Sequence, residues 1–263
     1  MKRFISNKFT LFFLGIIFVI MLWAFASLLF DRNGTIFPSP LLTFERFGKV
    51  LVESYTYQCL GYTFLRMLIG FAISFIIALF VGVLAGNHQS IYQFLKPLMT
   101  VIKSVPTVAL VFIFIVLVAP KDAPILVVCV VCFPILYEGV VGGIKSVDKQ
   151  LIQASQVDGA SYIRRIIYIK LPLSIPYIIV SMVSSFALSF KIEIMAEVIT
   201  GYTRNGLGSV IHFVQVDDPT NMSMVFAYSL LAIILMLLVT LFEEVIKQLV
   251  KKNTIVGSTI IDN

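Results

Sequence analysis

The chain has 263 residues, of which 59% are hydrophobic and only 13% are charged, and its mean hydropathy is +0.99. A soluble domain carries about 25% charged residues, and one core of this size could not bury so much apolar surface, so lipid is the expected solvent for much of it. The formal net charge of +6 comes with no basic patch interleaved with aromatic residues, which argues against nucleic-acid binding.

Six apolar runs are candidates for membrane spans, which need about 20 mostly apolar residues as a helix. They cover residues 9–30, 67–86, 97–119, 123–139, 173–198 and 222–242. The first is longer than the apolar core of a secretory signal peptide and is interpreted as a retained helix. The runs lack the ten-residue alternation of β-barrel strands. The sequence therefore predicts an all-α membrane protein with about six transmembrane helices.

Two of these spans contain features that interrupt a regular helix. Lys103 and Pro106 leave the start of the third span open. Pro106 and Pro134 are expected to kink their spans, since proline removes a backbone donor. Glu138 ends the fourth span and is expected at the inner membrane interface.

The basic residues are distributed unevenly around the spans, and the more basic loops of membrane proteins stay in the cytoplasm. With the N-terminus inside, thirteen basic residues are cytoplasmic: Lys2, Arg3, Lys8, Lys96, Lys103, Lys145, Lys149, Arg164, Arg165, Lys170, Lys247, Lys251 and Lys252. Six are outside: Arg32, Arg46, Lys49, Arg66, Lys121 and Arg204. The sequence therefore predicts that both termini are cytoplasmic.

The longest cytoplasmic loop, residues 142–172, is too polar to span and too regularly patterned to be a linker. Its apolar residues recur at helical spacing, which predicts an amphipathic elbow against the cytoplasmic face. Such an elbow has to bury its apolar stripe on lipid, on its own bundle or in a groove of a partner protein. A solvated loop that contains a turn is the simpler alternative, but it would need no such periodicity.

Within the loop, local signals predict two short helices joined by a turn. Residues 149–157 form the first helix, and the dipeptide Asp158-Gly159 is expected to end it. Ser161 can cap the second helix. Leu171-Pro172 is expected to end the second helix and to begin the next span.

This loop is similar to the signature loop of bacterial ATP-binding-cassette (ABC) importer permeases. The family pattern is Glu-Ala-Ala, three residues, Gly, nine residues, Ile, one residue and Leu-Pro, and every spacing fits. The matching positions are Gln153-Ala154-Ser155, Gly159, Ile169 and Leu171-Pro172. Gln153 replaces the usual acid and Ser155 the second alanine, so an ion pair with the ATPase at Gln153 is in doubt, because an amide keeps hydrogen bonds but carries no charge.

Other segments resemble the nitrate, sulfonate and taurine branch of that family, over roughly residues 37–208. They are Phe37-Pro38-Ser39-Pro40, Thr63-Phe64-Leu65-Arg66, Gly70-Phe71, Gly82-x-x-x-Gly86, Gly159-Ala160-Ser161, Ala196-Glu197 and Gly206-Leu207-Gly208. The resemblance implies the type I ABC importer permease fold in a bacterial inner membrane. It also implies a small solute, which in this branch is a sulfonate, nitrate, taurine, a thiamine-precursor pyrimidine or a flavin.

The resemblance further implies a set of partners. They are a second permease subunit, with a homodimer as the simpler expectation, a cytoplasmic ABC ATPase dimer and an extracytoplasmic substrate-binding protein. ATP and Mg²⁺ are expected on the ATPase, because this chain has no Gly-x-x-x-x-Gly-Lys-Ser/Thr loop. The chain is therefore expected to be a non-catalytic subunit without a cofactor of its own.

The expected contact surface with the ATPase is the elbow. The residues assigned to it are Gln153, Ala154, Ser155, Asp158, Gly159, Ala160, Ser161, Ile169, Leu171 and Pro172.

Ionisable residues inside spans are candidates for the translocation path. They are Lys191, Glu193 and Glu197 in the fifth predicted span, with Arg66 as a partner. Glu193 and Glu197 are four residues apart and share a helix face, while Lys191 points elsewhere. The alternative is that this part of the helix lies at the outer interface, where the three side chains are solvated. Glu197 belongs to the Ala196-Glu197 motif, which favours it over Glu193.

The chain is expected to divide into an N-terminal transmembrane helix (1–36), a permease core (37–250) that contains the coupling loop 142–172, and a cytoplasmic tail (251–263). Cys129-x-x-Cys132 lies in an apolar run and is interpreted as a pair of packing residues, with no metal site.

Two other function classes were weighed against the importer. A secondary transporter would show inverted repeats with matching broken helices, and none is clear. An intramembrane enzyme would need paired catalytic residues at depth, but both histidines, His88 and His212, lie in predicted loops. The identity and the charge of the solute stay open, because a separate binding protein does much of the selection.

Overall fold

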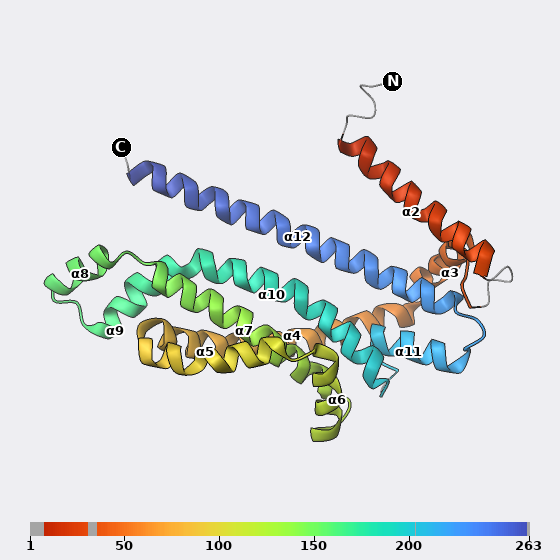
Figure 1. The fold of residues 1–263 in the computed structure, drawn as a ribbon, viewed down its shortest axis with the longest axis horizontal. Helices are drawn as coiled ribbons and strands as arrows, with labels where there is room; N and C mark the ends of the chain where they lie inside the picture. Colours follow the sequence, from red (N-terminus) through yellow and green to blue (C-terminus); the bar gives the residue numbers. More distant parts are fainter. Residues whose placement is uncertain (1–7, 31–35, 203, 262–263) are drawn as a thin grey trace.

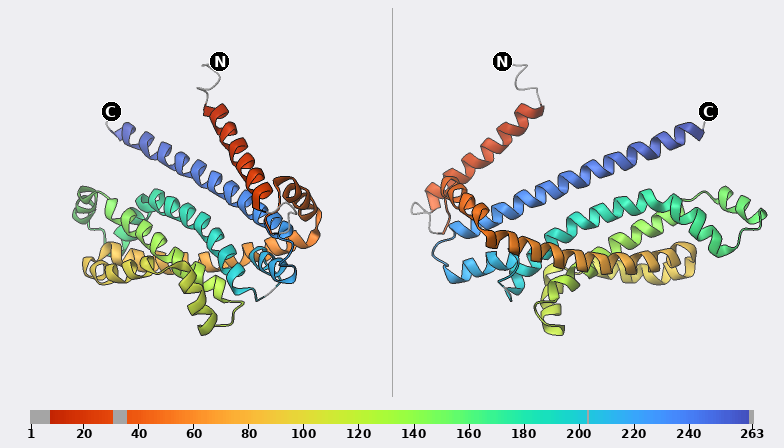
Figure 2. Two further views of the ribbon diagram at one scale, coloured as in Figure 1. Left: turned by 45° about the vertical axis from the view of Figure 1, so that its right-hand side comes forward. Right: turned by 180° about the vertical axis from the view of Figure 1, so that it is seen from behind.

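The computed structural model describes residues 8–30, 36–202 and 204–261, so Lys2, Arg3 and Arg32 of the topology count lie outside the described residues. All regular elements of the described part are helical (Figure 1, Figure 2), which confirms the predicted all-α class. In chain order they are α2 (Lys8–Phe30), α3 (Pro40–Val52), α4 (Ser54–Asn87), α5 (Gln89–Ser104), α6 (Thr107–Leu117), α7 (Ala123–Ser146), α8 (Lys149–Val157), α9 (Tyr162–Arg165), a π-helical turn (Ile166–Lys170), α10 (Leu171–Thr200), α11 (Leu207–Asp217) and α12 (Ser223–Ile261).

Five helical segments of the described chain are long and apolar enough to cross a membrane, and α5 with α6 makes a sixth if that bent pair counts as one span. The two helices meet at an angle of 96°, which confirms the expected kink at Pro106 within the candidate span 97–119. The bend follows from Pro106, which forces the preceding Val105 into extended backbone. Pro134 lies inside α7, which continues past it to Ser146.

The centre of the molecule is a bundle of α4, α7 and α10, packed closely at small residues. A Cβ added at Gly82 of α4 would lie 2.8 Å from the Cβ of Val140 in α7. A Cβ at Gly143 of α7 would lie 2.9 Å from the Cβ of Ser174 in α10. The pairs Gly82-x-x-x-Gly86 and Gly139-x-x-x-Gly143 therefore bring helices of this chain together, as small residues do in membranes.

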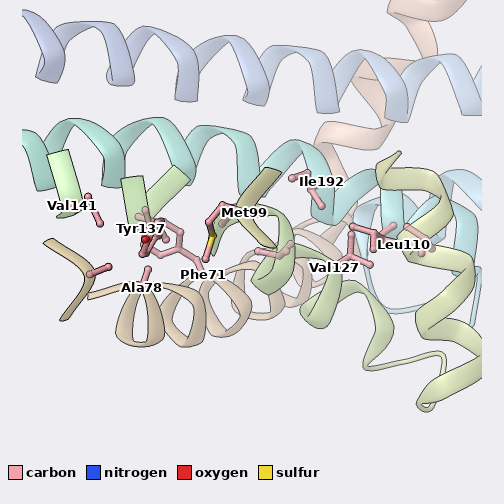
Figure 3. Close-up of a cluster of buried hydrophobic side chains, with 14 residues drawn as sticks. Phe71, Ala78, Met99, Leu110, Val127, Tyr137, Val141 and Ile192 are labelled. Carbon is pink, nitrogen blue, oxygen red and sulfur yellow. The ribbon is translucent and has the colours of Figure 1, made fainter. Parts of the chain in front are cut away.

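The largest hydrophobic cluster lies between these helices and the bent pair (Figure 3). It joins residues of α4, α5, α6, α7 and α10, among them Phe71, Met99, Leu110, Tyr137 and Ile192. Cys132 is buried in the same cluster, and its thiol lies 3.6 Å from the carbonyl oxygen of Ser185. This position fits its interpretation as a packing residue.

Helix α2 stands apart from the bundle and is attached at one end (Figure 1). The indole Nε1 of Trp23 donates to the carbonyl of Pro38 at 3.1 Å, and the Ser27 hydroxyl donates to the carbonyl of Phe37 at 2.9 Å. The ring of Trp23 also stacks on Phe226 of α12, with centroids 6.0 Å apart. Elsewhere its apolar side chains are exposed, and so are available to lipid or to another chain.

Three helical segments were not expected from the sequence. Helix α3 begins at Pro40 behind Ser39, whose hydroxyl accepts from the amide of Leu42 at 3.3 Å, a regular N-cap with proline in the first turn. Helix α11 is a short helix that follows Gly206. Helix α12 continues to Ile261, so residues 251–261 of the expected tail are helical.

Candidate functional site

The first helix of the elbow has the predicted bounds, Lys149–Val157. Asp148 caps it by accepting the amide of Gln150 at 2.8 Å. At its end the amide of Ala160 donates back to the carbonyl of Ser155 at 3.0 Å, around Gly159 with φ of +77°. This is the hydrogen-bond pattern of a Schellman turn, which needs a left-handed residue that glycine supplies at no steric cost. The predicted turn at Asp158-Gly159 is confirmed.

The second helix begins as predicted but does not end where the sequence suggested. The Ser161 hydroxyl accepts the amide of Arg164 at 3.4 Å and so caps α9. The chain then passes through a π-helical turn directly into α10, so Leu171-Pro172 ends no helix. In a π-helical turn each backbone amide donates to the carbonyl five residues earlier instead of four. Pro172 lies in the first turn of α10, where a missing backbone N–H breaks no hydrogen bond of that helix. The helical segment Tyr162–Thr200 is therefore continuous.

The elbow lies at one end of the molecule, beyond the ends of α5 and α7 (Figure 1). Large apolar side chains on it are exposed: Val157 by 88%, Ile163 by 67% and Tyr168 by 73%. Its apolar residues are therefore not buried on the bundle of its own chain. An exposed apolar surface of this kind is typical of a site that meets another molecule.

The residues expected to contact the ATPase differ in how far they are exposed. Six are exposed, namely Gln153, Ala154, Asp158, Gly159, Ser161 and Pro172. Three are partly buried, namely Ala160, Ile169 and Leu171. Ser155 is buried and its hydroxyl donates to the carbonyl of Ile152 at 2.7 Å, so its side chain stabilises α8 from within.

Two side-chain contacts tie the elbow to the turn between α4 and α5. The ammonium group of Lys170 donates to the side-chain oxygen of Asn87 at 2.6 Å. The hydroxyl of Tyr162 and Nε2 of His88 share a hydrogen bond of 3.1 Å. His88 is therefore part of the contact between the elbow and the bundle, a role that its place in a predicted loop did not indicate.

At the opposite end of α10, buried charges form a second site, called here the Glu197 cluster (Thr63, Arg66, Glu197, Asn205 and Gly208). Arg66 Nη1 lies 2.9 Å from Glu197 Oε1 and also donates to the carbonyl of Asn205 at 2.7 Å. Glu197 Oε2 accepts from the Thr63 hydroxyl at 2.7 Å and from the Gly208 amide at 3.0 Å. Arg66, which the sequence suggested as a partner for the ionisable residues of the fifth predicted span, thus pairs with Glu197.

The glycines beside this cluster are required by close packing. A Cβ at Gly206 would collide with the carboxylate of Glu197, and one at Gly208 with the carbonyl of Ile194. The amide of Leu207 donates to the Thr63 hydroxyl at 2.8 Å. The segment around Thr63 thus meets the two neighbouring segments around Glu197 and Gly206, and these contacts fix the start of α11 to α4 and α10.

The other two predicted path residues do not join this cluster. Glu193 is fully buried, and its carboxylate has no hydrogen-bond partner among the described residues. Lys191 is exposed on another face of α10. Both glutamates are thus enclosed by protein rather than solvated. The structure brings Arg66 and Glu197 together and leaves Lys191 apart, and a role of all four in the path stays a prediction.

In the part of the chain that the structure describes, no group of three or more His, Cys, Asp and Glu residues could hold a metal ion. His212 lies in α11 rather than in a loop, and it packs against Gly201. Contacts at both sites join helices to one another, and the elbow exposes an apolar surface.

The arrangement of membrane-length helices with an exposed elbow matches the permease subunits of type I ABC importers. The fold aligns with an inward-facing structure of the MetNI methionine ABC transporter with a TM-score of 0.62 and 18% sequence identity. The alignment covers 74% of this chain and 96% of that one. The predicted fold is thereby confirmed.

The chain belongs to the family of binding-protein-dependent transport system inner membrane components, whose family model matches residues 76–252. It is 22% identical over 204 residues to SsuC of Bacillus subtilis, an aliphatic sulfonates transport permease protein, with 77% of this chain and 73% of SsuC covered. It is 26% identical over 232 residues to RibX of Chloroflexus aurantiacus, a riboflavin transport system permease protein, with 87% and 85% covered. The names of these relatives state different solutes.

Proposed function

We propose that this chain pairs with a second permease subunit to form the translocation path of an ABC importer for a small solute. A binding protein outside the membrane delivers the solute, and a cytoplasmic ABC ATPase dimer binds ATP with Mg²⁺ and hydrolyses it. The second subunit is another copy of this chain, because one chain carries both the elbow and the spans. The elbow is the observation that carries this proposal, since its exposed apolar residues need a partner.

The elbow is suited to docking because its shape is fixed before a partner arrives. Asp148 and Ser161 cap its two helices, and the turn at Gly159 is hydrogen-bonded on both sides. A preformed surface loses little conformational entropy on binding, which favours affinity. Gln153 is exposed in this surface and offers the ATPase a neutral hydrogen bond instead of an ion pair.

Movement of the elbow reaches the far side of the bundle through one rigid element. The continuous helical segment Tyr162–Thr200 has 39 residues, which at 1.5 Å per residue gives about 58 Å. The Glu197 cluster attaches its far end to α4. Closure of the ATPase dimer would draw two elbows together and rock the spans outward-open. Reversing such an equilibrium from 1:99 to 99:1 needs about 5.5 kcal/mol of differential binding.

The proposed solute is a sulfonate, nitrate, taurine, a thiamine precursor or a flavin-like molecule. Similarity to the sulfonate permease SsuC and to the riboflavin permease RibX supports this range. The proposed orientation has the elbow and both termini in the cytoplasm of a bacterial cell, in agreement with the distribution of lysine and arginine.

A matched pair of substitutions at Gly159 tests the docking surface. A side chain there meets no heavy atom within 4 Å, but φ of +77° restricts the choice to residues that tolerate a left-handed backbone. Asp and Asn both do so and have the same size, and only Asp adds a charge to the surface that would be covered. We expect Gly159→Asp to lower co-purification of the ATPase about tenfold or more, and Gly159→Asn to retain it within about threefold.

The experiment uses the full chain co-expressed with an ABC ATPase from the same gene neighbourhood and purified in nanodiscs, with permease-dependent ATP hydrolysis as the second readout. Both variants have to elute as folded protein, and Ile163→Glu with Ile163→Gln provides an independent pair on the exposed part of α9. An ATPase that binds all four variants equally would show that the elbow is not the docking surface. An absence of ATPase binding to wild type would overturn the importer proposal.

A further inference from the structure

Helix α5 has three distinct faces, which follow from a rotation of about 100° per residue. One face is polar and exposed along the whole helix. Its residues are Gln89, Gln93, Lys96, Thr100, Lys103 and Ser104. They occupy an arc of roughly 100°, so they form one continuous stripe rather than scattered polar positions.

The two other faces of α5 are apolar and differ in burial. Phe94, Leu98 and Val101 are exposed by 79%, 49% and 61%. On the third face Leu95 and Met99 pack into the hydrophobic cluster (Figure 3). The helix thus has one face for its own bundle, one that suits lipid and one that suits water. A helix in contact only with bundle and lipid would need no polar stripe.

Helix α7 is almost enclosed by its neighbours and exposes four residues. They are Glu138, Gly142, Lys145 and Ser146, spaced four and then three or four apart. They therefore follow one side of the helix, and none has a large apolar side chain. Glu138 lies eight residues before the end of α7 at Ser146, so the helix continues past it for about two turns.

Side-chain contacts join these two exposed stripes. Lys103 of α5 forms an ion pair with Glu138 of α7, and both side chains are about half exposed. At the other end, Lys145 donates to the side chain of Gln89 at 3.4 Å and lies 3.1 Å above the ring of Tyr92. The two stripes form one surface, called here the polar strip (Gln89, Gln93, Lys96, Thr100, Lys103, Ser104 of α5 and Glu138, Gly142, Lys145, Ser146 of α7).

The charged and polar side chains of this surface favour water or protein over lipid as its neighbour. α5 runs alongside α4 and α7 in all views (Figure 1, Figure 2), from the elbow end into the bundle. Thr100 is eleven residues from Gln89, about 16 Å along the helix. A charged side chain costs about 2.5–3.5 kcal/mol at the centre of a spanning helix, so such residues face water or protein instead.

We propose that the polar strip lines the inner half of the translocation path and that the path there favours solutes with an anionic group. The inference rests on the proposed function and names its solute class. Lys96, Lys103 and Lys145 face this surface with Glu138 as its one acid. Glu138 is paired with Lys103, and Lys96 has no ion pair among the described residues. The Glu197 cluster, by contrast, is buried and holds helices together.

Cysteine modification in membrane vesicles tests both the assignment of the polar strip to the path and the preference for anionic solutes. The experiment requires no knowledge of the solute. In a background with Cys59, Cys129 and Cys132 replaced, Thr100→Cys is compared with Val101→Cys, its neighbour at the same depth on the exposed apolar face. The probes are an anionic sulfonatoethyl and a cationic trimethylammonioethyl methanethiosulfonate, each scaled to its rate with a free thiol in solution. Rates are measured with and without ATP and the ATPase.

We expect Thr100→Cys to react at least about tenfold faster than Val101→Cys, because thiolates form in water and not in lipid. The anionic probe should be favoured, and Lys96→Gln should reduce this preference severalfold. Equal rates at both positions in every state would overturn the path assignment and indicate that the strip is covered, for example by the second copy. A preference for the cationic probe, or no effect of Lys96→Gln, would overturn the solute class.

Failure of this inference can be told apart from failure of the proposed function, because modification requires neither transport nor a partner. An unreactive Thr100→Cys in a permease that still couples to its ATPase would contradict the path assignment alone. A reactive Thr100→Cys in a chain that binds no ATPase would contradict the importer and leave a water-filled surface in the membrane.

Discussion

At the scale of single residues, two glutamates one helical turn apart have opposite surroundings. Glu197 is 1% exposed and accepts hydrogen bonds from Arg66, Thr63 and the Gly208 amide. Glu193 is 0% exposed and has no hydrogen-bond partner among the described residues. A buried charge is tolerated when it is paired and costly when it is not. The first carboxylate should therefore stabilise the bundle, and the second should not.

The same substitution at both positions tests this contrast. Glu197→Gln removes the charge that compensates Arg66, so we expect it to destabilise the folded protein by about 2 kcal/mol or more. Glu193→Gln removes an unpaired carboxylate and is expected to leave stability unchanged or to raise it. The measurement is thermal unfolding of each purified variant in detergent, followed by the loss of monodisperse protein, with the exposed Lys191→Gln as a neutral reference. An equal loss of stability at both glutamates would show that Glu193 has a partner of comparable strength.

At the scale of elements, the sequence predicts best the helix bounds and turns that are determined by residues a few positions apart. The bounds of α8 and the turn at Gly159 follow from caps and turn residues a few positions apart, and the structure confirms them. The bend of the third span follows from Pro106, but its size depends on how α6 packs on α7. The continuity of α9 with α10 was missed because proline normally indicates a helix end, and a π turn has no clear sequence signal.

Contacts between charged residues that are distant in the sequence are likewise harder to predict than local features. The sequence suggested Arg66 as a partner for the ionisable residues of the fifth predicted span, and in the structure it pairs with Glu197. The Lys103–Glu138 pair does not follow from the sequence, which predicts Glu138 at the end of a shorter helix and leaves the start of the span around Lys103 open. Contacts between residues 35 positions apart depend on helix register, which apolar runs specify only to within a few residues.

The contact between the elbow and the α4–α5 turn gives a prediction at this scale. Lys170→Met keeps the long apolar stem but removes the hydrogen bond to Asn87, worth about 1 kcal/mol at a partly exposed site. We expect backbone amides of residues 158–165 to exchange with solvent about fivefold faster. Hydrogen exchange with mass spectrometry in nanodiscs provides the measurement.

Two further variants decide how the effect of Lys170→Met is interpreted. Asn87→Leu removes the other partner and should reproduce the faster exchange. Lys149→Met removes an exposed lysine of the same elbow whose side chain forms no hydrogen bond or ion pair with the described residues, and it should leave exchange unchanged. If Lys149→Met accelerated exchange equally, the faster exchange would result from loss of positive charge and not from loss of the hydrogen bond between Lys170 and Asn87.

At the scale of the whole molecule, a single copy leaves surfaces that need neighbours. Helix α2 exposes apolar side chains on nearly every side, the elbow exposes Val157 and Tyr168, and the polar strip faces away from the bundle. Lipid suits the first of these surfaces but not the other two. A second permease subunit and a cytoplasmic partner would satisfy all of them, which is why the assembly and the function are proposed together.

The orientation of the chain is testable with two single cysteines in the cysteine-free background. Val157→Cys lies on the exposed elbow, and Thr220→Cys lies in the exposed turn before α12, at the opposite end of α10. With a membrane-impermeant maleimide, we expect Val157→Cys to react only in inside-out vesicles and Thr220→Cys only in right-side-out spheroplasts. Reaction of both from one side would mean that α10 does not cross the membrane. Reaction from opposite sides means that one continuous helix joins the ATPase side to the Glu197 cluster, as the proposed coupling requires.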